Sequence, residues 1–422
     1  MIIDNCFYAN ETLAGKDQYP DIRIKRTPDG PWSRSSASNA TLRDFSAVCY
    51  FSAMHMKREL PALAAVPIGL VQSSVGGTCI ESWMSSEALQ AAGTPPQNST
   101  CLTQTLCQGM QPNCANYLPL ILPLAPFTFD AMLWYQGESN TNCGTSPTQP
   151  PWRGYASLLP ALVDSWRALF ASSFTAYVFQ LAPYGSVDEA PQQRSSDTLP
   201  LLREAQLAVL RNSSSSAPAN AAVVVPLDLG DDGHTVYTPP SARHGGLHPR
   251  NKTEFGRRMA LRFGELNGLL AAGVASTGPQ PLRATLDAGG ASVTLAFAPP
   301  SAAGGPGSQL RLAPTQFCAT QGALPAPWNA SSANCCQAEL GQARALHGWP
   351  FELRVNGSYV LARATVVALA GGAPGVSLAP LNASAGALQA VRYGWQGWPL
   401  CVLGNEAGLP AGQFVLPVGG AA

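Results

Sequence analysis

The sequence predicts an α/β domain with a largely parallel sheet, followed by a smaller domain built of β-strands. Up to about residue 273, short apolar runs alternate with segments whose apolar residues recur at helical spacing, which is the pattern of an α/β domain. Beyond that point, glycine- and proline-rich joints separate short runs of β-forming residues. A chain of 422 residues is long enough for two such domains, and we expect them to span residues 1–273 and 276–422.

Helices and strands alternate along the predicted α/β domain. The spacing of apolar residues predicts helices over residues 41–63, 80–91, 154–170 and 201–212. Short apolar runs predict buried strands over residues 66–71, 131–133, 176–182 and 221–226. A last helix is expected after Asn251, because Glu254 stands three residues later in the manner of a capping box. Residues 1–40 are expected to be irregular, apart from a possible strand over Asp21–Ile24.

The second domain is predicted from its short β runs and one turn signal. Strands are expected over residues 282–286, 292–297, 351–355, 359–369 and 390–393. Asn356 and Gly357 lie between two of these runs, and an Asn-Gly pair in that position is a signal for a tight hairpin. Three aromatic residues near the end, Tyr393, Trp395 and Trp398, are expected to pack within the protein rather than to contact a glycan.

Composition excludes several classes of protein. The formal net charge is zero and charged residues make up only 12% of the chain, so no basic cluster is present to bind nucleic acid. The most apolar stretch, Tyr117–Trp134, is interrupted by three prolines and Asp130, whereas a membrane-spanning helix needs about 20 mostly apolar residues. No Cys-x-x-Cys pair occurs, which argues against a zinc site, and we expect no metal and no cofactor.

Cysteines and glycosylation sequons favour an oxidising compartment. The chain has 11 cysteines, and eight of its asparagines, including Asn98, Asn251 and Asn356, stand in Asn-x-Ser/Thr sequons. Disulfides are expected among Cys101, Cys107 and Cys114. The N-terminus has no basic start and Asp4 interrupts its apolar run, so it is not a signal peptide. We expect the natural chain to begin further upstream.

Two segments of the α/β domain are candidate walls of an active site. The segment Trp134–Asn140, with sequence WYQGESN, follows a predicted strand, and side chains at the carboxyl ends of such strands converge on a crevice. Asn140 is a candidate donor to an oxyanion, with Gln136 and Glu138 as candidate substrate contacts. The backbone N–H groups of Gly76 and Gly77, ahead of a predicted helix, could serve the same oxyanion. The alternatives are that the amides cap a turn and that the two glycines only form one.

A histidine and two acids complete the set of candidates. His248 lies just before the last predicted helix, where it could act as a general base. Asp231 and Asp232 are candidates for the carboxylate that orients it. The alternatives are a structural histidine and a solvated acidic turn.

Long segments of the chain resemble a known family. The stretches IGLVQSSVGGTCIESWMS, AMLWYQGESN and LHPRNKTEFGRRMAL, in that order, and the closing VRYGWQGWPLCVLGNEAGLPAGQF are similar to SGNH-type carbohydrate esterases of the sialate O-acetylesterase family. The resemblance implies a flavodoxin-like three-layer domain followed by a β domain. It also implies hydrolysis of O-acetyl esters on sugars through an acyl-enzyme on serine, with no metal or organic cofactor.

The chain departs from the family pattern in two places. The family's nucleophile lies in a Gly-Gln-Ser-Asn-Met type block after the first sheet strand, and we expect that strand and block to lie ahead of Met1. Many relatives have an aspartate two or three residues before the histidine, where this chain has Gly246 and Gly245, so Asp231 or Asp232 would take that role.

No serine of the candidate segments fits the nucleophile. Ser73, Ser74 and Ser139 do not stand in a Gly-x-Ser-x-Gly turn, and in the resembling family they are scaffold.

The sequence therefore predicts a secreted or lysosomal carbohydrate esterase for O-acetyl esters of sialic acids or related glycans, with no nucleic-acid partner and no membrane span. Two alternatives stay open: an esterase for acetylated xylan or another polysaccharide, and a catalytically inactive carbohydrate-binding relative that lacks the nucleophile block.

Overall fold

The computed structural model divides into two compact units. The first consists of residues 1–57, 65–179 and 205–223, and the second of residues 58–64, 180–204 and 224–422. The predicted domain bounds, 1–273 and 276–422, stay a prediction. The structure describes residues 2–5, 45–94, 98, 100–101, 112–141, 151–184, 198–210, 220–230, 248–298, 309–314, 350–381, 386–397, 399 and 401–419. The possible strand over Asp21–Ile24 lies outside these residues.

The first unit is built around a five-stranded sheet with the order β2-β1-β3-β4-β5. Its strands are β1 (Ile2–Asn5), β2 (Leu70–Gln72), β3 (Ala131–Trp134), β4 (Thr175–Phe179) and β5 (Ala221–Val224). The pairings β1–β2, β1–β3 and β3–β4 are all parallel. The predicted parallel sheet is therefore confirmed, and β3 and β4 are buried along their whole length, as strands covered on both faces are.

The expectation that the first sheet strand is missing is wrong for this structure. Ile2–Asn5 form β1 between β2 and β3, with Ile2 opposite Leu70 on one side and Ala131 on the other. In this segment Asp4 interrupts the apolar run by which a buried strand could be identified from the sequence. Backbone hydrogen bonds to partners far along the chain determine its place instead, because backbone groups in a sheet must be paired.

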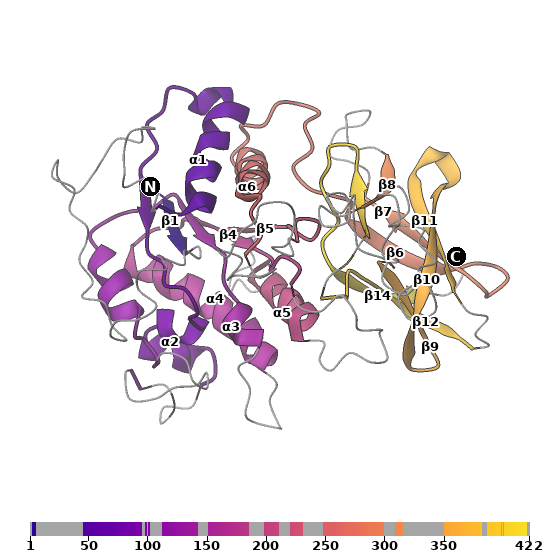
Figure 1. Ribbon diagram of the computed structural model, residues 1–422, viewed down its shortest axis with the longest axis horizontal. Coiled ribbons are helices and arrows are strands. Elements are labelled where there is room, and N and C mark those ends of the chain that lie inside the picture. The colour runs from indigo at the N-terminus through magenta and orange to yellow at the C-terminus, as the bar shows by residue number, and fades with distance from the viewer. Residues whose placement is uncertain are drawn as a thin grey trace, which may run out of the picture. The chain divides into compact units, whose positions relative to one another are not determined.

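Helices cover the sheet of the first unit close to where the sequence predicts them. Figure 1 shows α1 (Ala47–Glu59) on one side of the strands, and α2 (Ser86–Ala91), α3 (Glu138–Thr141) and α4 (Pro151–Leu169) on the other. α1 begins after Ser46, whose Oγ accepts a hydrogen bond from the backbone N of Cys49 (3.3 Å), as an N-cap does.

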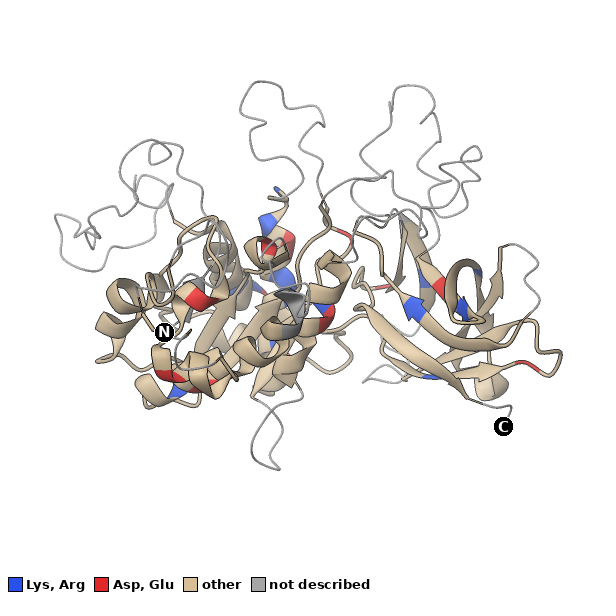
Figure 2. Cartoon of the chain, turned by 90° about the horizontal axis from the view of Figure 1, so that it is seen from below, with Lys and Arg blue, Asp and Glu red and all other residues tan. Residues whose placement is uncertain are grey.

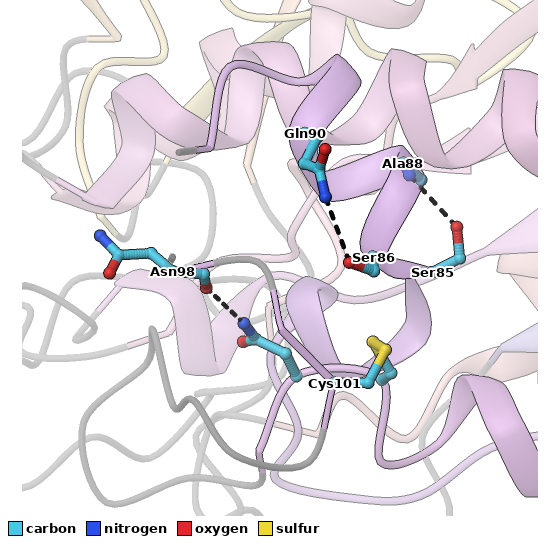
Figure 3. Close-up of a disulfide and its surroundings, with 8 residues drawn as sticks. Ser85, Ser86, Ala88, Gln90, Asn98 and Cys101 are labelled. Carbon is cyan, nitrogen blue, oxygen red and sulfur yellow. Dashed lines mark hydrogen bonds between the residues drawn. A yellow bond between two sulfur atoms is a disulfide. The ribbon is translucent and has the colours of Figure 1, made fainter. Parts of the chain in front are cut away.

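The predicted helix over residues 80–91 is two elements rather than one. A 3₁₀ turn covers Ile80–Trp83, and α2 begins only after Ser85, whose Oγ accepts from the backbone N of Ala88 at 3.1 Å (Figure 3). A capping serine in the interior of the segment starts a new helix there. The predicted helix over residues 201–212 appears as α5 (Thr198–Gln206) and a 3₁₀ turn.

One disulfide of the predicted group is present. Cys101 and Cys114 are bonded, with 5.1 Å between their Cα atoms (Figure 3). Cys107 lies outside the described residues, while Cys79 and Cys401 are also disulfide-bonded. The prediction that cysteines of this chain form disulfides is therefore confirmed.

The second unit contains α6 (Lys252–Leu266) and a closed barrel with the strand order β10-β11-β7-β6-β14-β12-β9. The barrel strands are β6 (Pro281–Leu286), β7 (Val293–Phe297), β9 (Phe351–Val355), β10 (Ser358–Ala368), β11 (Pro374–Pro380), β12 (Leu388–Tyr393) and β14 (Phe414–Gly419). A separate two-stranded sheet joins β8 (Leu310–Pro314) and β13 (Cys401–Asn405). The predicted β domain and its five predicted strands are confirmed.

The predicted hairpin and packing of aromatic residues are also confirmed. β9 and β10 are antiparallel and meet at Asn356 and Gly357, whose φ angles of +48° and +87° are those of a tight primed turn. Tyr393 is fully buried and its ring lies 4.9 Å from that of Phe351. Trp395 is buried as well, and Trp398 lies outside the described residues.

A buried ion pair joins two neighbouring strands of the barrel. Arg392 on β12 stands opposite Glu352 on β9 and donates a hydrogen bond to it from Nε. The guanidinium also lies 3.8 Å from the ring centre of Tyr359 and 5.2 Å from that of Trp395, so two aromatic faces attract the same cation.

Replacing Arg392 by methionine is expected to lower the free energy of unfolding by about 3–5 kcal/mol, because the buried carboxylate of Glu352 loses the cation that faces it. Replacing both residues, as Glu352→Leu with Arg392→Met, is expected to recover most of that loss. Urea unfolding of the two variants measures the difference. A double variant no more stable than Arg392→Met alone would contradict the explanation.

Candidate functional site

The candidate site in the first unit is the junction of two loops that follow β2 and β3. These strands flank β1 on its two sides and run parallel to it, so their carboxyl ends reach the same edge of the sheet. Ligands of open α/β sheets bind at that edge, beside the strand where the order reverses. The first loop carries Gly76 and Gly77, and the second carries Gln136 and Asn140.

The loop after β2 exposes its two glycines. Gly76 and Gly77 are exposed, and Gly77 has a φ of +70° with open space where a Cβ would stand, a conformation that suits glycine. Thr78 closes the turn, because its Oγ1 donates to the carbonyl of Val75 (2.9 Å) and accepts from Nε1 of Trp83 (2.9 Å). The loop therefore presents backbone rather than side chains to solvent.

The loop after β3 is buried. It turns at Gly137, whose φ of +141° favours glycine, and continues directly into α3. Gln136, Glu138 and Asn140 are all buried, with Asn140 only 1% exposed. The predicted amide cluster is thus part of the packed interior at the sheet's edge.

Gln136 ties the two loops together. Its Nε2 donates to the carbonyl of Thr78 (2.9 Å) and to Oδ1 of Asn140 (2.7 Å). Its Oε1 accepts from Oη of Tyr155 on α4 (2.9 Å). Because both Nε2 hydrogens are used, Gln136 holds the junction, and the suggestion that Gln136 and Glu138 contact substrate stays a prediction.

Asn140 is held on three sides. Its Oδ1 accepts from the backbone N of Ile80 (3.0 Å) as well as from Gln136, and its Nδ2 donates to Oε2 of Glu81 (3.0 Å). An amide has two Nδ2 hydrogens, and among the described residues Asn140 has an acceptor for one of them. The second hydrogen is the one that could serve an oxyanion.

Tyr155 supports the loop from α4. Its Oη accepts from Nε1 of Trp134 (2.9 Å), and Gln206 donates from Nε2 to the carbonyl of Gln136 (3.1 Å). Burial raises the pKa of Tyr155, and the nearby carboxylates of Glu138 and Glu81 add to the rise. The tyrosine is therefore a neutral hydrogen-bonding group.

Glu81 is a buried acid at the centre of the junction. It lies in the 3₁₀ turn Ile80–Trp83 and is 9% exposed. Burial raises the pKa of Glu81, and the hydrogen bond from Asn140 offsets part of that rise. No lysine or arginine of the described residues forms an ion pair with it.

This burial predicts a pH-dependent stability for the variant Glu81→Gln. Because its pKa is raised, the carboxyl of Glu81 stays protonated to a higher pH in the folded protein than in the unfolded chain, where its ordinary pKa is 4.5. The contribution of Glu81 to the free energy of unfolding is fully present below the pKa of the unfolded state. It is lost as the pH rises through the raised pKa of the folded state. Glu81→Gln is therefore expected to equal the wild type in free energy of unfolding at acidic pH and to exceed it at alkaline pH, as measured in urea.

The matched control is Glu87→Gln. Glu87 is exposed on α2, and its own backbone N–H and the Ser85 hydroxyl lower the pKa of its carboxyl, so its contribution is lost on the acid side instead. Curves of wild type and Glu81→Gln that stay parallel from acid to alkaline pH would contradict the assignment.

His248 belongs to the second unit. It is half-buried and stands before Pro249 and Asn251. Asn251 caps α6, with its Oδ1 accepting from the backbone N of Glu254 (3.3 Å), so the predicted capping position is confirmed. The histidine thus precedes a helix with a fixed start.

An ion-pair cluster strengthens that helix. Arg258 binds Asp228 through two hydrogen bonds, Nη1–Oδ1 at 2.5 Å and Nη2–Oδ2 at 2.7 Å, and its Nε donates to Glu254 (2.9 Å). Burial raises the pKa of Glu254, but the hydrogen bonds of Arg257 and the charge of Arg258 outweigh it and hold the pKa below its ordinary value. Asp228 is therefore occupied in a structural pair, whereas Asp231 and Asp232 lie outside the described residues.

The serines of the site segments are bound to their own surroundings. Ser73 donates from Oγ to the carbonyl of Leu120 (2.8 Å), and Ser74 accepts from Nε2 of Gln72 (2.9 Å). Ser139 is buried within α3. Their assignment as scaffold agrees with these contacts.

The described residues contain neither a metal-binding cluster nor a membrane-spanning helix. No cluster of histidine, cysteine, aspartate and glutamate there could hold a metal ion, and no helix there is both long and apolar enough to cross a membrane. Figure 2 shows acidic and basic residues sparsely interspersed on the described elements. The absence of a nucleic-acid partner stays a prediction.

Comparison with known families places both loops inside one match. Residues 31–212 match the model of a family described as carbohydrate esterase, sialic acid-specific acetylesterase. These residues make up less than half of the chain, and over them the chain is similar to this family. Both loops of the junction fall within the matched residues, and His248 does not.

Two curated sialate O-acetylesterases are similar to the chain over part of their length. It is 29% identical to the sialate O-acetylesterase of Homo sapiens over 292 residues, which cover 63% of this chain and 52% of that protein. It is 28% identical to the sialate O-acetylesterase of Rattus norvegicus over 317 residues, covering 63% and 55%. The chain thus spans about half the length of these relatives.

A solved structure shares the fold. The crystal structure of a carbohydrate acetylesterase from Xanthomonas citri matches with a TM-score of 0.60 at 23% sequence identity, over 93% of this chain and 70% of that one. The chain therefore shares its fold with that protein.

Proposed function

We propose that this protein is a carbohydrate esterase that hydrolyses O-acetyl esters of sialic acids or related glycans through a serine acyl-enzyme. The observation that supports this most directly is the hydrogen-bonded junction of Asn140, Gln136 and Glu81. Among the described residues, Asn140 has an acceptor for only one of its two Nδ2 hydrogens. The exposed Gly76–Gly77 turn precedes Ile80 and Glu81 of this junction in the chain. Both parts lie within the residues that match the family.

The proposed reaction assigns one role to each candidate residue. A serine attacks the acetyl carbonyl, and His248 takes its proton and later activates water. The oxyanion of the tetrahedral intermediate accepts hydrogen bonds from Nδ2 of Asn140 and from the backbone N–H of Gly76 or Gly77. Asp231 or Asp232 orients the imidazole.

The fold supports the same proposal. The order β2-β1-β3-β4-β5 is that of flavodoxin-like sheets, and we propose that residues 1–273 form an SGNH-type three-layer hydrolase domain followed by the β domain 276–422. The Cys101–Cys114 disulfide and the sequons, of which Asn98 and Asn356 are exposed, support a secreted or lysosomal glycoprotein.

Acetate release by the purified natural protein tests this function. An O-acetylated sialic acid, acetylated xylan and 4-nitrophenyl acetate are the substrates, and we expect kcat/KM to be highest for the sialic acid. A higher value for xylan would support a polysaccharide esterase instead. Binding of glycan without release of acetate from any substrate would support the inactive relative.

A second measurement identifies the nucleophile. A fluorophosphonate is expected to label one serine covalently, and peptide mass spectrometry locates it. Labelling of Ser73, Ser74 or Ser139 would overturn their assignment as scaffold.

A further inference from the structure

Glu81 is the one acid whose carboxylate contacts the proposed oxyanion donor among the described residues. Its Oε2 lies 3.0 Å from Nδ2 of Asn140, 59 residues away in the chain. Its backbone is held from the other side, because the N–H of Cys114 donates to the carbonyl of Glu81 (3.1 Å) and that of Asn116 to the carbonyl of Ser82 (2.8 Å). The carboxylate is thus presented to Asn140 from a rigid turn.

The hydrogen bonds allow Asn140 one orientation of its amide. Oδ1 faces two donors, the N–H of Ile80 and Nε2 of Gln136. Turning the amide over would direct its NH₂ group at those donors and its oxygen at the carboxylate of Glu81. Gln136 cannot adapt, because Tyr155 and the carbonyl of Thr78 fix its own amide.

An acid is an expensive acceptor at this position. A buried carboxyl without a cation costs stability, and a neutral amide or hydroxyl could accept the same hydrogen bond. Departures from the most stable choice of residue concentrate at functional sites. The cost of burying it here, together with its contact to Asn140, points to a function of the acceptor at this position in the geometry of Asn140.

We propose that Glu81 is a positioning residue of the esterase, which fixes the side chain of Asn140 so that its second Nδ2 hydrogen is directed at the developing oxyanion. This rests on the proposed function. Glu81 does not touch the substrate in this scheme. It acts only through Asn140, and that sets its expected kinetic signature.

Kinetics of three variants test the proposal. Glu81→Ala is expected to lower kcat about 30-fold with KM within about twofold of wild type, because the lost interaction is one made in the transition state. Glu81→Gln is expected to recover most of that loss, since its Oε1 can accept the same hydrogen bond. The double variant Glu81→Ala with Asn140→Ala is expected to be no slower than Asn140→Ala alone, because the two residues act as one unit.

Several outcomes would overturn the proposal. Additive losses of kcat in the double variant, an unchanged kcat with raised KM, or no recovery in Glu81→Gln would each show that Glu81 does not act through Asn140. Asp164→Asn is the matched control, since Asp164 is exposed on α4 and pairs with Arg167. The kcat of this variant is expected to equal that of the wild type.

A readout without catalysis separates this proposal from the proposed function. If the wild type releases no acetate, the proposed function is wrong. The side-chain ¹⁵NH₂ resonances of Asn140, assigned with Asn140→Ala, then test the positioning role of Glu81 independently of catalysis. They are expected to shift and to exchange faster with solvent in Glu81→Ala than in Glu81→Gln. Unchanged resonances in Glu81→Ala would overturn the positioning role.

Discussion

Replacing His248 by glutamine is expected to lower kcat for acetate release by about 10³-fold, since general acid–base catalysis contributes roughly 10²–10⁴. Glutamine keeps hydrogen-bonding capacity but cannot take the proton of the serine or of water. The histidine stands just before α6, whose start is fixed by Asn251 and Glu254, so the substitution is expected to shift Tm by less than about 4 °C. Steady-state kinetics and a thermal scan measure both quantities.

The control for His248 is Arg250→Gln, two residues further on and exposed, which is expected to leave kcat unchanged. A His248→Gln variant that keeps more than about a tenth of wild-type kcat would show that another group is the base. Asp231→Asn and Asp232→Asn complete the series. The variant with the larger loss of kcat identifies the acid that orients the imidazole.

Replacing Asn140 by alanine is expected to lower kcat by about 10²–10³-fold, which is the cost of removing one oxyanion-hole donor. Asn140 also joins Ile80, Gln136 and Glu81, so the alanine variant loses stability as well. The loss of kcat must therefore be separated from the loss of packing. A Tm scan beside the kinetics gives the first part of that separation.

A paired substitution gives the second part. Asn140→Asp with Glu81→Gln reverses the direction of the hydrogen bond between the two positions and keeps the acceptor that faces Ile80 and Gln136. This variant is expected to be close to the wild type in Tm and still at least about 10²-fold slower in kcat, because the donor to the oxyanion is gone. Full activity in the paired variant would exclude Asn140 as that donor.

The sequence predicts elements whose signal is local. The hairpin at Asn356 and Gly357 follows from two residues, and β7 shows the alternation of buried and half-buried residues that identifies a strand. β11 escapes prediction because prolines stand at both of its ends, and β14 because Pro417 stands within it. Proline is read as a break in a strand pattern. β1 escapes prediction because Asp4 interrupts its short apolar run.

The residues of the candidate site also fall into those with a local sequence signal and those without one. Gly76, Gly77 and Asn140 could be identified because small and amide residues after a strand indicate a turn near a ligand. Glu81 could not, although it stands in the segment that carries the family resemblance. Its role depends on a contact with Asn140 that crosses 59 residues, and no local pattern records such a contact.

The Cys101–Cys114 disulfide connects the junction to the oxidation of the chain after its synthesis. Cys114 is bonded to Cys101, holds a φ of +62°, and donates its N–H to the carbonyl of Glu81. A newly synthesised, reduced chain has to place this backbone without the crosslink, against the entropy of the loop. Closing the Cys101–Cys114 disulfide removes part of that entropy from the unfolded chain, so it favours the ordered backbone on which Glu81 lies.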